Sequence, residues 1–137
     1  MWLIFALLSA LFASLTSILG KIGIAGINSN LATAIRTMVV VAMSWLMVFV
    51  THSGTSFSSI SRRSWIFLIL SGISTGASWL CYYRALQVGH ASKVVSIDKL
   101  SIIFTIILAG IFLGEQLTVK SIIGCILIAL GSLLMVI

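Results

Sequence analysis

The chain alternates between long apolar runs and short polar connections. Five runs of about 17–20 residues occupy residues 2–19, 31–50, 65–83, 94–113 and 121–137. A helix of about 20 apolar residues crosses the ~30 Å hydrocarbon core of a bilayer. Lipid offers the backbone no hydrogen-bonding partner, so each run is expected to be helical. The pattern predicts an all-α, polytopic membrane helix bundle with five transmembrane helices.

The connections between these runs lie at residues 20–30, 51–64, 85–92 and 114–120. We expect the last two to be tight turns. Asn28 or Asn30 is suited to cap the second helix, because a short side-chain oxygen accepts from the free N–H groups at a helix start. An odd number of spans would place the two termini on opposite sides of the membrane.

Composition strengthens the membrane assignment and excludes several function classes. Hydrophobic residues make up 61% of the 137 residues and charged residues only 7%, whereas soluble domains carry about 25% charged residues. The net charge of +6 comes from eight Lys and Arg scattered at the ends of apolar runs, which is typical of interfacial anchors rather than of a nucleic-acid site. No nucleophile–base pair or metal-ligand cluster is evident. We therefore predict one membrane domain over residues 1–137, without enzymatic activity, metal or cofactor.

Ionisable residues inside the apolar runs are the main functional candidates. Arg36 lies in the second run, and Asp98 and Lys99 lie in the fourth. A charge at the centre of a span costs about 2.5–3.5 kcal/mol on the insertion scale, so such residues usually face a cavity or a partner. Ser101 and Thr105 follow Asp98 at helical spacing and would share its face. Two roles stay open for Asp98: a structural pair with a Lys or Arg, or proton or cation coupling.

Aromatic and small residues supply the remaining candidates. Trp79, Tyr82 and Tyr83 could stack on a substrate or cation, or form an aromatic belt at the membrane interface. Small residues mark helix-packing faces in membranes. The predicted packing or dimer positions are Gly72 and Gly76 in the third run and Gly124, Ile128 and Gly131 in the fifth.

Three tracts resemble motifs of the EamA family, within the drug/metabolite transporter superfamily. They are YYRALQ at 82–87 with AS at 91–92, FLGEQLT at 112–118, and the glycines at 124 and 131. Lys21 and Arg36 stand where that family often has a Lys after the first span and an Arg in the second. The resemblance covers nearly the whole chain. Many members carry a Pro in the fourth span, where this chain has Ile97-Asp98-Lys99.

The resemblance implies a secondary transporter or exporter of small metabolites or organic cations that works by alternating access. Many members contain two five-span repeats of opposite orientation, whereas this chain is one. Its cations are nearly balanced between the two faces, with Arg62, Arg63 and Lys120 on one and Lys21, Arg36, Arg84 and Lys93 on the other. Such a chain could insert both ways and pair antiparallel with itself. The fifth run is similar to the dimerising last span of the small multidrug resistance branch.

The expected setting is a bacterial or archaeal cytoplasmic membrane, with a small-molecule substrate and the lipid bilayer as partners. An alternative is a non-catalytic subunit of a heteromeric complex, such as a lipid-linked sugar flippase, acting with a paired small membrane protein. The expected cavity residues are Arg36, Trp79, Tyr82, Tyr83, Asp98, Lys99, Ser101 and Thr105.

Overall fold

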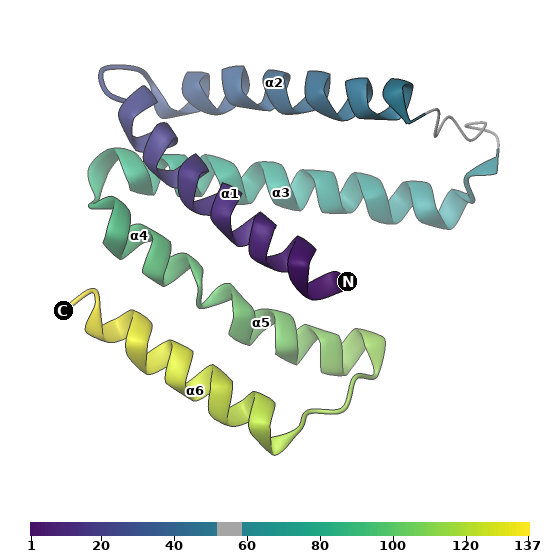
Figure 1. The fold of residues 1–137 in the computed structure, drawn as a ribbon, viewed down its shortest axis with the longest axis vertical. Coiled ribbons are helices and arrows are strands. Elements are labelled where there is room, and N and C mark those ends of the chain that lie inside the picture. The colour runs from purple at the N-terminus through teal and green to yellow at the C-terminus, as the bar shows by residue number, and fades with distance from the viewer. Residues whose placement is uncertain (52–58) are drawn as a thin grey trace. The chain divides into compact units, whose positions relative to one another are not determined.

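The protein was studied as a computed structural model, which describes residues 1–51 and 59–137. The helices are α1 (Trp2–Gly23), α2 (Ser29–Val50), α3 (Arg62–Val88), α4 (Ala91–Asp98), α5 (Ser101–Leu108), η2 (Ala109–Leu113) and α6 (Val119–Leu134) (Figure 1). No strand occurs within these described ranges, so the predicted all-α class is confirmed. Residues 52–58 of the predicted second connection lie outside the described residues.

Four helical stretches are long and apolar enough to cross a membrane: α1, α2, α3 and the stretch Ala91–Leu113 that contains α4, α5 and η2. The fifth, α6, is a shorter apolar helix of 16 residues. At about 1.5 Å per residue it spans roughly 24 Å, and local thinning of the bilayer can accommodate such a length. All five predicted spans are therefore present as apolar helices.

The connection predicted at residues 85–92 is shorter in the structure. The turn expected at 85–92 is wrong over Ala85–Val88, which form the last turn of α3. Ala, Leu and Gln are good helix formers, and Leu86 is fully buried, which stabilises this extra turn. The tight connection is thus confined to Gly89 and His90, the N-cap of α4.

The fourth span is interrupted where the sequence predicted one continuous helix. The Leu100 N–H donates to the Ile97 carbonyl over 2.9 Å, and the Ile103 N–H donates to the Leu100 carbonyl over 3.0 Å. These are the i to i−3 bonds of a short 3₁₀ turn. Three residues per turn keep Asp98 and Ser101 on nearly the same face, so the break does not separate them.

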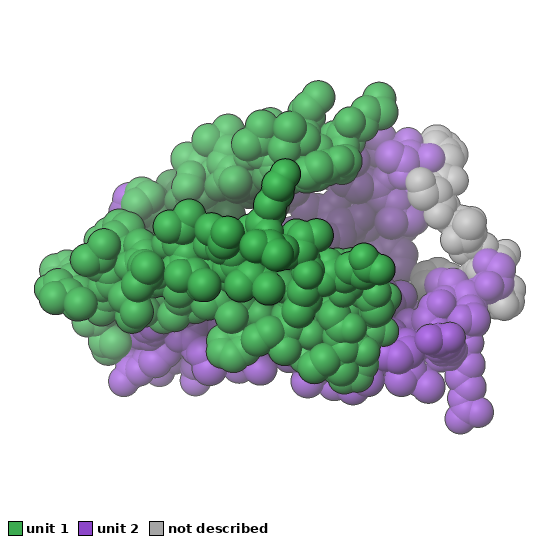
Figure 2. Space-filling view, turned by 90° about the horizontal axis from the view of Figure 1, so that it is seen from below, with its two compact units in different colours: residues 1–19, 88–137 green, residues 20–87 purple. Residues whose placement is uncertain are grey.

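The chain divides into two compact units, coloured separately in Figure 2. Unit 1 contains Met1–Leu19 and Val88–Ile137, and unit 2 contains Gly20–Gln87. Within unit 1, α6 packs on both α4 and α5. Lys93 donates from Nζ to the Val136 carbonyl over 2.6 Å, which joins the first turn of α4 to the residues just after α6.

Unit 2 pairs α2 and α3 side by side in opposite directions (Figure 1). The turn that leads into α2 contains Gly26, whose φ of 77° lies in the left-handed region that glycine adopts without a Cβ clash. Asn28 then caps α2, because its side-chain oxygen accepts from the Asn30 N–H over 2.9 Å. This geometry decides between the two predicted caps in favour of Asn28.

Buried side chains are few among the described residues. Three apolar side chains are buried, namely Ile24, Tyr83 and Leu86, and all three belong to unit 2. The buried polar side chains are Ser17, Ser29, Thr33, Ser96 and Ser132. Small hydroxyl residues let membrane helices approach closely. Most large apolar side chains face outward, as expected for helices that lie in lipid or against another chain.

Candidate functional site

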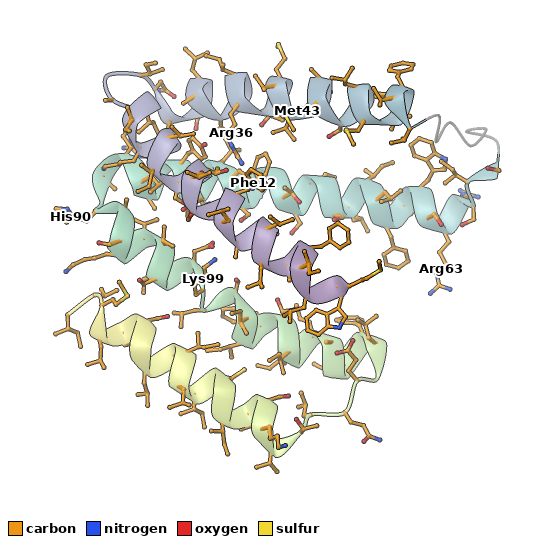
Figure 3. The ribbon with its side chains drawn as sticks, in the orientation of Figure 1. Phe12, Arg36, Met43, Arg63, His90 and Lys99 are labelled. Atoms are coloured by element: carbon orange, nitrogen blue, oxygen red, sulfur yellow. The ribbon has the colours of Figure 1, made fainter. Side chains whose placement is uncertain are left out.

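Arg36 lies within the membrane-spanning helix α2, and its guanidinium lies against two aromatic rings of α3. It follows the first residue of α2, Ser29, by seven positions (36 − 29 = 7), which is about 10 Å along the helix. Its guanidinium carbon lies 3.8 Å from the centroid of the Trp79 ring and 5.3 Å from that of Tyr83. Figure 3 shows Arg36 reaching from α2 toward α3. The site is therefore an arginine held against aromatic rings within a span.

The two rings meet the arginine because of their spacing on α3. Trp79 and Tyr83 are four residues apart, and residues with this spacing stack on one face of an α-helix. Tyr83 is buried, whereas Arg36 and Trp79 are half-buried. Tyr82 lies beside the pair, with its ring edge-on to that of Tyr83 at a centroid distance of 6.2 Å.

The aromatic rings stabilise the arginine without neutralising it. A cation over an aromatic face gains about 0.5–1 kcal/mol when exposed and about 2 kcal/mol or more when desolvated. That gain offsets part of the cost of a charge in a span. Residues 20–87, the whole of unit 2, include no Asp or Glu. The positive charge of Arg36 therefore has no acidic counterpart within its own unit.

Side-chain hydrogen bonds link the end of α3 to the end of α1 and to the turn before α2 in unit 2. Lys21 donates from Nζ to the Leu86 carbonyl over 2.5 Å. Gln87 donates from Nε2 to the Ile27 carbonyl over 2.8 Å and accepts from Arg84 over 2.8 Å. The last carbonyls of a helix have no partner within it, and a lysine is a favourable one because the C-terminus carries partial negative charge.

The same end of unit 2 brings Gly20 against the ring of Tyr83. A Cβ placed on Gly20 would lie 3.0 Å from the Tyr83 hydroxyl oxygen and 3.3 Å from its Cζ. A side chain at residue 20 would therefore press on the buried tyrosine ring, and glycine avoids this contact. Gly20 thus leaves room for the Tyr83 ring beside Arg36.

Asp98 and Lys99 lie at the interruption of the fourth span in unit 1. Asp98 is the last residue of α4, and Lys99 is its C-cap. Both side chains are exposed in the described chain, and Lys99 is labelled at the break in Figure 3. The backbone N–H groups of Leu100 and Ile103 stay hydrogen-bonded across this turn. The coupling role of Asp98 stays a prediction.

Ser101 and Thr105 lie on α5 directly after the break. The Thr105 hydroxyl donates to the Ser101 carbonyl over 2.9 Å, so it is satisfied within its own helix. Both residues are exposed in the described chain. Their predicted place in a polar cavity stays a prediction.

The predicted packing glycines are open on the described chain. A Cβ added to Gly72, Gly76, Gly124 or Gly131 would meet no described atom within 4 Å beyond its own helix. Ile128, between the last two glycines, is half-buried. Their role as dimer contacts stays a prediction.

Comparison with known proteins identifies the family. The model of the EamA-like transporter family matches residues 1–137. The chain belongs to the EamA-like transporter family. It is 47% identical over 134 residues to an "uncharacterized transporter in cobO 3'region" of Sinorhizobium sp, a match that covers 98% of this chain and 95% of that protein. The resemblance stated from the sequence motifs is therefore confirmed, and the protein is an integral, multi-pass membrane transporter.

Two further relatives are longer than this chain. The "uncharacterized transporter YxxF" of Bacillus subtilis is 29% identical over 133 residues, which is 96% of this chain but 41% of that protein. The "magnesium transporter NIPA3" of Pongo abelii is 37% identical over 73 residues, which is 53% of this chain and 17% of that protein. No solved structure matches the chain.

The structure brings Arg36, Trp79, Tyr82 and Tyr83 together from the predicted cavity set. Sequence reasoning did not predict the contacts that Lys21, Gly20 and Gln87 make around them. The available signals were weak: a lysine just after the first span and a glycine just before that lysine. Such features are common at helix ends, and only the fold shows which groups they meet.

Proposed function

We propose that the protein is a secondary transporter that moves small metabolites across the membrane by alternating access, as an antiparallel homodimer. In this proposal Arg36, Trp79 and Tyr83 form the core of the substrate site, with Tyr82 beside them. Asp98, Lys99, Ser101 and Thr105, all in unit 1, are proposed to line an aqueous pathway of their own unit. The observation that carries the proposal is Arg36 itself, a half-buried cation on a spanning helix whose own unit contains no acidic residue. Ionisable groups inside spans commonly mark transport pathways.

The dimer part of the proposal is supported by length and charge. The chain matches 41% of the length of its Bacillus subtilis relative, so a second copy would supply a comparable amount of chain. Inverted repeats in transporters require two halves of opposite orientation. When Arg36 is assigned to the site, three cations remain near each face: Arg62, Arg63 and Lys120 against Lys21, Arg84 and Lys93. Such a balance sets no preferred orientation.

The geometry supports small metabolites better than organic cations, the other class expected from the sequence. An organic cation would need the faces of Trp79 and Tyr83, and Arg36 already lies over them. Mg²⁺ belongs in any substrate panel because one relative is named a magnesium transporter. Hard cations of this kind prefer carboxylate oxygens, and the chain has two acidic residues in total.

Proteoliposome uptake tests the proposal. The intact chain would be reconstituted and supplied with a radiolabelled panel of amino acids, carboxylic acids, sugar phosphates, quaternary amines and Mg²⁺, with and without a proton gradient. We expect saturable uptake of at least one metabolite, reduced at least about tenfold in Arg36→Gln. Arg63→Gln is the matched control, because Arg63 also lies over a ring, that of Phe67 at 5.8 Å, but at the start of α3. Absence of uptake across the panel, or equal loss in both variants, would count against the proposal.

A further inference from the structure

The contacts of Arg36 leave its hydrogen-bonding capacity unused. A guanidinium group has five N–H donors arranged in a planar fork. Within residues 1–51 and 59–137, Arg36 contacts the Trp79 and Tyr83 rings and has no hydrogen bond or ion pair with another side chain or carbonyl. No buried side-chain nitrogen or oxygen in the described chain lacks a partner. The Arg36 side-chain nitrogens therefore keep exposed surface in the described chain.

The charges of unit 2 indicate which kind of group can bind Arg36. Unit 2 carries Lys21, Arg36, Arg62, Arg63 and Arg84 and no acid. Of these five cations, Arg36 lies deepest along its span, about 10 Å from the start of α2. A second cation would be repelled there, and a neutral group would leave the charge uncompensated. An acceptor-only group with two or three oxygens both matches the fork and supplies the missing charge.

We propose that Arg36 binds an oxyanion, a carboxylate or a phosphate group, with Trp79 and Tyr83 fixing the guanidinium so that its donors are presented in one direction. This inference rests on the proposed function for the idea that the ligand is cargo. The oxyanion can belong to a soluble metabolite or to the headgroup of a lipid, and the chemistry at Arg36 is the same for both. The rings stabilise the free site, and the ligand completes its hydrogen bonds.

The cation–π contact provides a spectroscopic reporter. The chain has four tryptophans, Trp2, Trp45, Trp65 and Trp79, and replacing the first three with Phe leaves Trp79 as the only indole. An anion on the guanidinium 3.8 Å away changes the electric field at that ring, so the Trp79 emission should shift on binding. The full-length chain in phosphatidylcholine nanodiscs would be titrated with sodium benzoate and with inorganic phosphate, and with tetraethylammonium as the cationic probe.

We expect a saturable emission shift with benzoate or phosphate and none with tetraethylammonium. Arg36→Gln should weaken the apparent affinity at least about tenfold, because charge-assisted hydrogen bonds are lost. Arg36→Lys should fall between the two, because it keeps the charge but not the bidentate fork. Arg63→Gln should behave as the parent chain. Anion-dependent thermal stabilisation of the unmodified protein provides a second readout that does not depend on the tryptophan background.

A second arm identifies the source of the oxyanion. If the shift appears only when phosphatidylglycerol is added to the nanodiscs, and is lost in Arg36→Gln, the lipid headgroup is the ligand and the oxyanion site is supported. If no oxyanion or anionic lipid shifts the emission, or if Arg36→Gln responds like the parent, the inference is wrong.

It is also wrong if binding appears only after both acids are removed in Asp98→Asn/Glu115→Gln, because the chain's own carboxylate would then be the counter-charge. Uptake of a cationic substrate without any oxyanion response would reject this inference while leaving the transporter proposal standing.

Discussion

The Nζ atom of Lys21 donates a hydrogen bond over 2.5 Å to the backbone carbonyl of Leu86, 65 residues later in the chain. Leu86 is among the last four residues of α3, whose carbonyls have no partner inside the helix. The bond therefore joins the end of α1 to the end of α3 within unit 2. Leu86 is within one helical turn of Tyr83, so the bond also helps to hold the part of α3 that carries the Tyr83 ring.

Removing the Lys21 donor should loosen this end of unit 2. Lys21→Met keeps most of the side-chain length but leaves the Leu86 carbonyl without its charged donor. We expect a loss of about 1–2 kcal/mol in the free energy of unfolding, from the hydrogen bond and the favourable charge at a helix C-terminus. Chemical unfolding in lipid bicelles measures it. Lys120→Met, at an exposed lysine near the start of α6, is the control, and an equal loss there would contradict the assignment.

The close approach of Gly20 to Tyr83 predicts an unfavourable Gly20→Ala substitution. An added methyl group would lie 3.0 Å from the Tyr83 hydroxyl oxygen, and Tyr83 is 4% exposed and has little room to move. Overpacking of this kind costs about 1–3 kcal/mol, more than the ~1 kcal/mol that Gly→Ala gains within a helix. Gly23→Ala, which meets no described atom within 4 Å, is the matched control and should be neutral or stabilising.

A double-mutant cycle separates this contact from general effects on α1. Tyr83→Phe removes the hydroxyl oxygen that the new methyl group would meet. Gly20→Ala should therefore cost at least ~0.5 kcal/mol less in the Tyr83→Phe background than in the parent. Additive effects, measured by unfolding in bicelles, would show that the two residues do not meet.

The open glycine faces predict substitutions that affect assembly rather than folding. Gly124→Leu and Gly131→Leu add bulk at positions where an added Cβ would meet no described atom within 4 Å beyond its own helix, so we expect the protomer to tolerate them. If these positions pack against a second copy, the dimer dissociation constant should rise at least about tenfold. Cross-linking and analytical ultracentrifugation in detergent measure it. Gly23→Leu is the control, and unchanged dimerisation in both α6 variants would place the interface elsewhere.

If Asp98, at the end of α4, couples transport to an ion gradient, its removal should abolish gradient-driven uptake but not downhill exchange. Asp98→Asn keeps the shape and removes the titratable group. We expect gradient-driven accumulation in proteoliposomes to fall at least about tenfold, while downhill exchange of the same substrate persists. Glu115→Gln, beyond the end of η2, should leave both activities unchanged. Full gradient-driven uptake by Asp98→Asn would limit Asp98 to a structural role.

The sequence by itself determined the membrane class, the number of spans and the family. These follow from local properties: runs long enough to cross lipid, too few charges for a soluble surface, and motifs in a fixed order. The absence of Asp and Glu from residues 20–87 is likewise visible in the printed sequence. Because unit 2 contains no acid, the charge of Arg36 favours an oxyanion as its ligand.

Tertiary structure decided which groups meet. The pattern of residues could not show that Arg36 of α2 lies over Trp79 of α3, because such a contact depends on the rotation and register of two helices that local hydrophobicity leaves free. The same holds for the bond between Lys21 and Leu86. The 3₁₀ turn after Asp98 could not be predicted either, because no proline or glycine lies near it in the sequence. A helix whose side chains are mostly apolar can face lipid in almost any rotation about its axis. The few polar contacts of unit 2 therefore fix its arrangement, and they become visible only once the helices are packed.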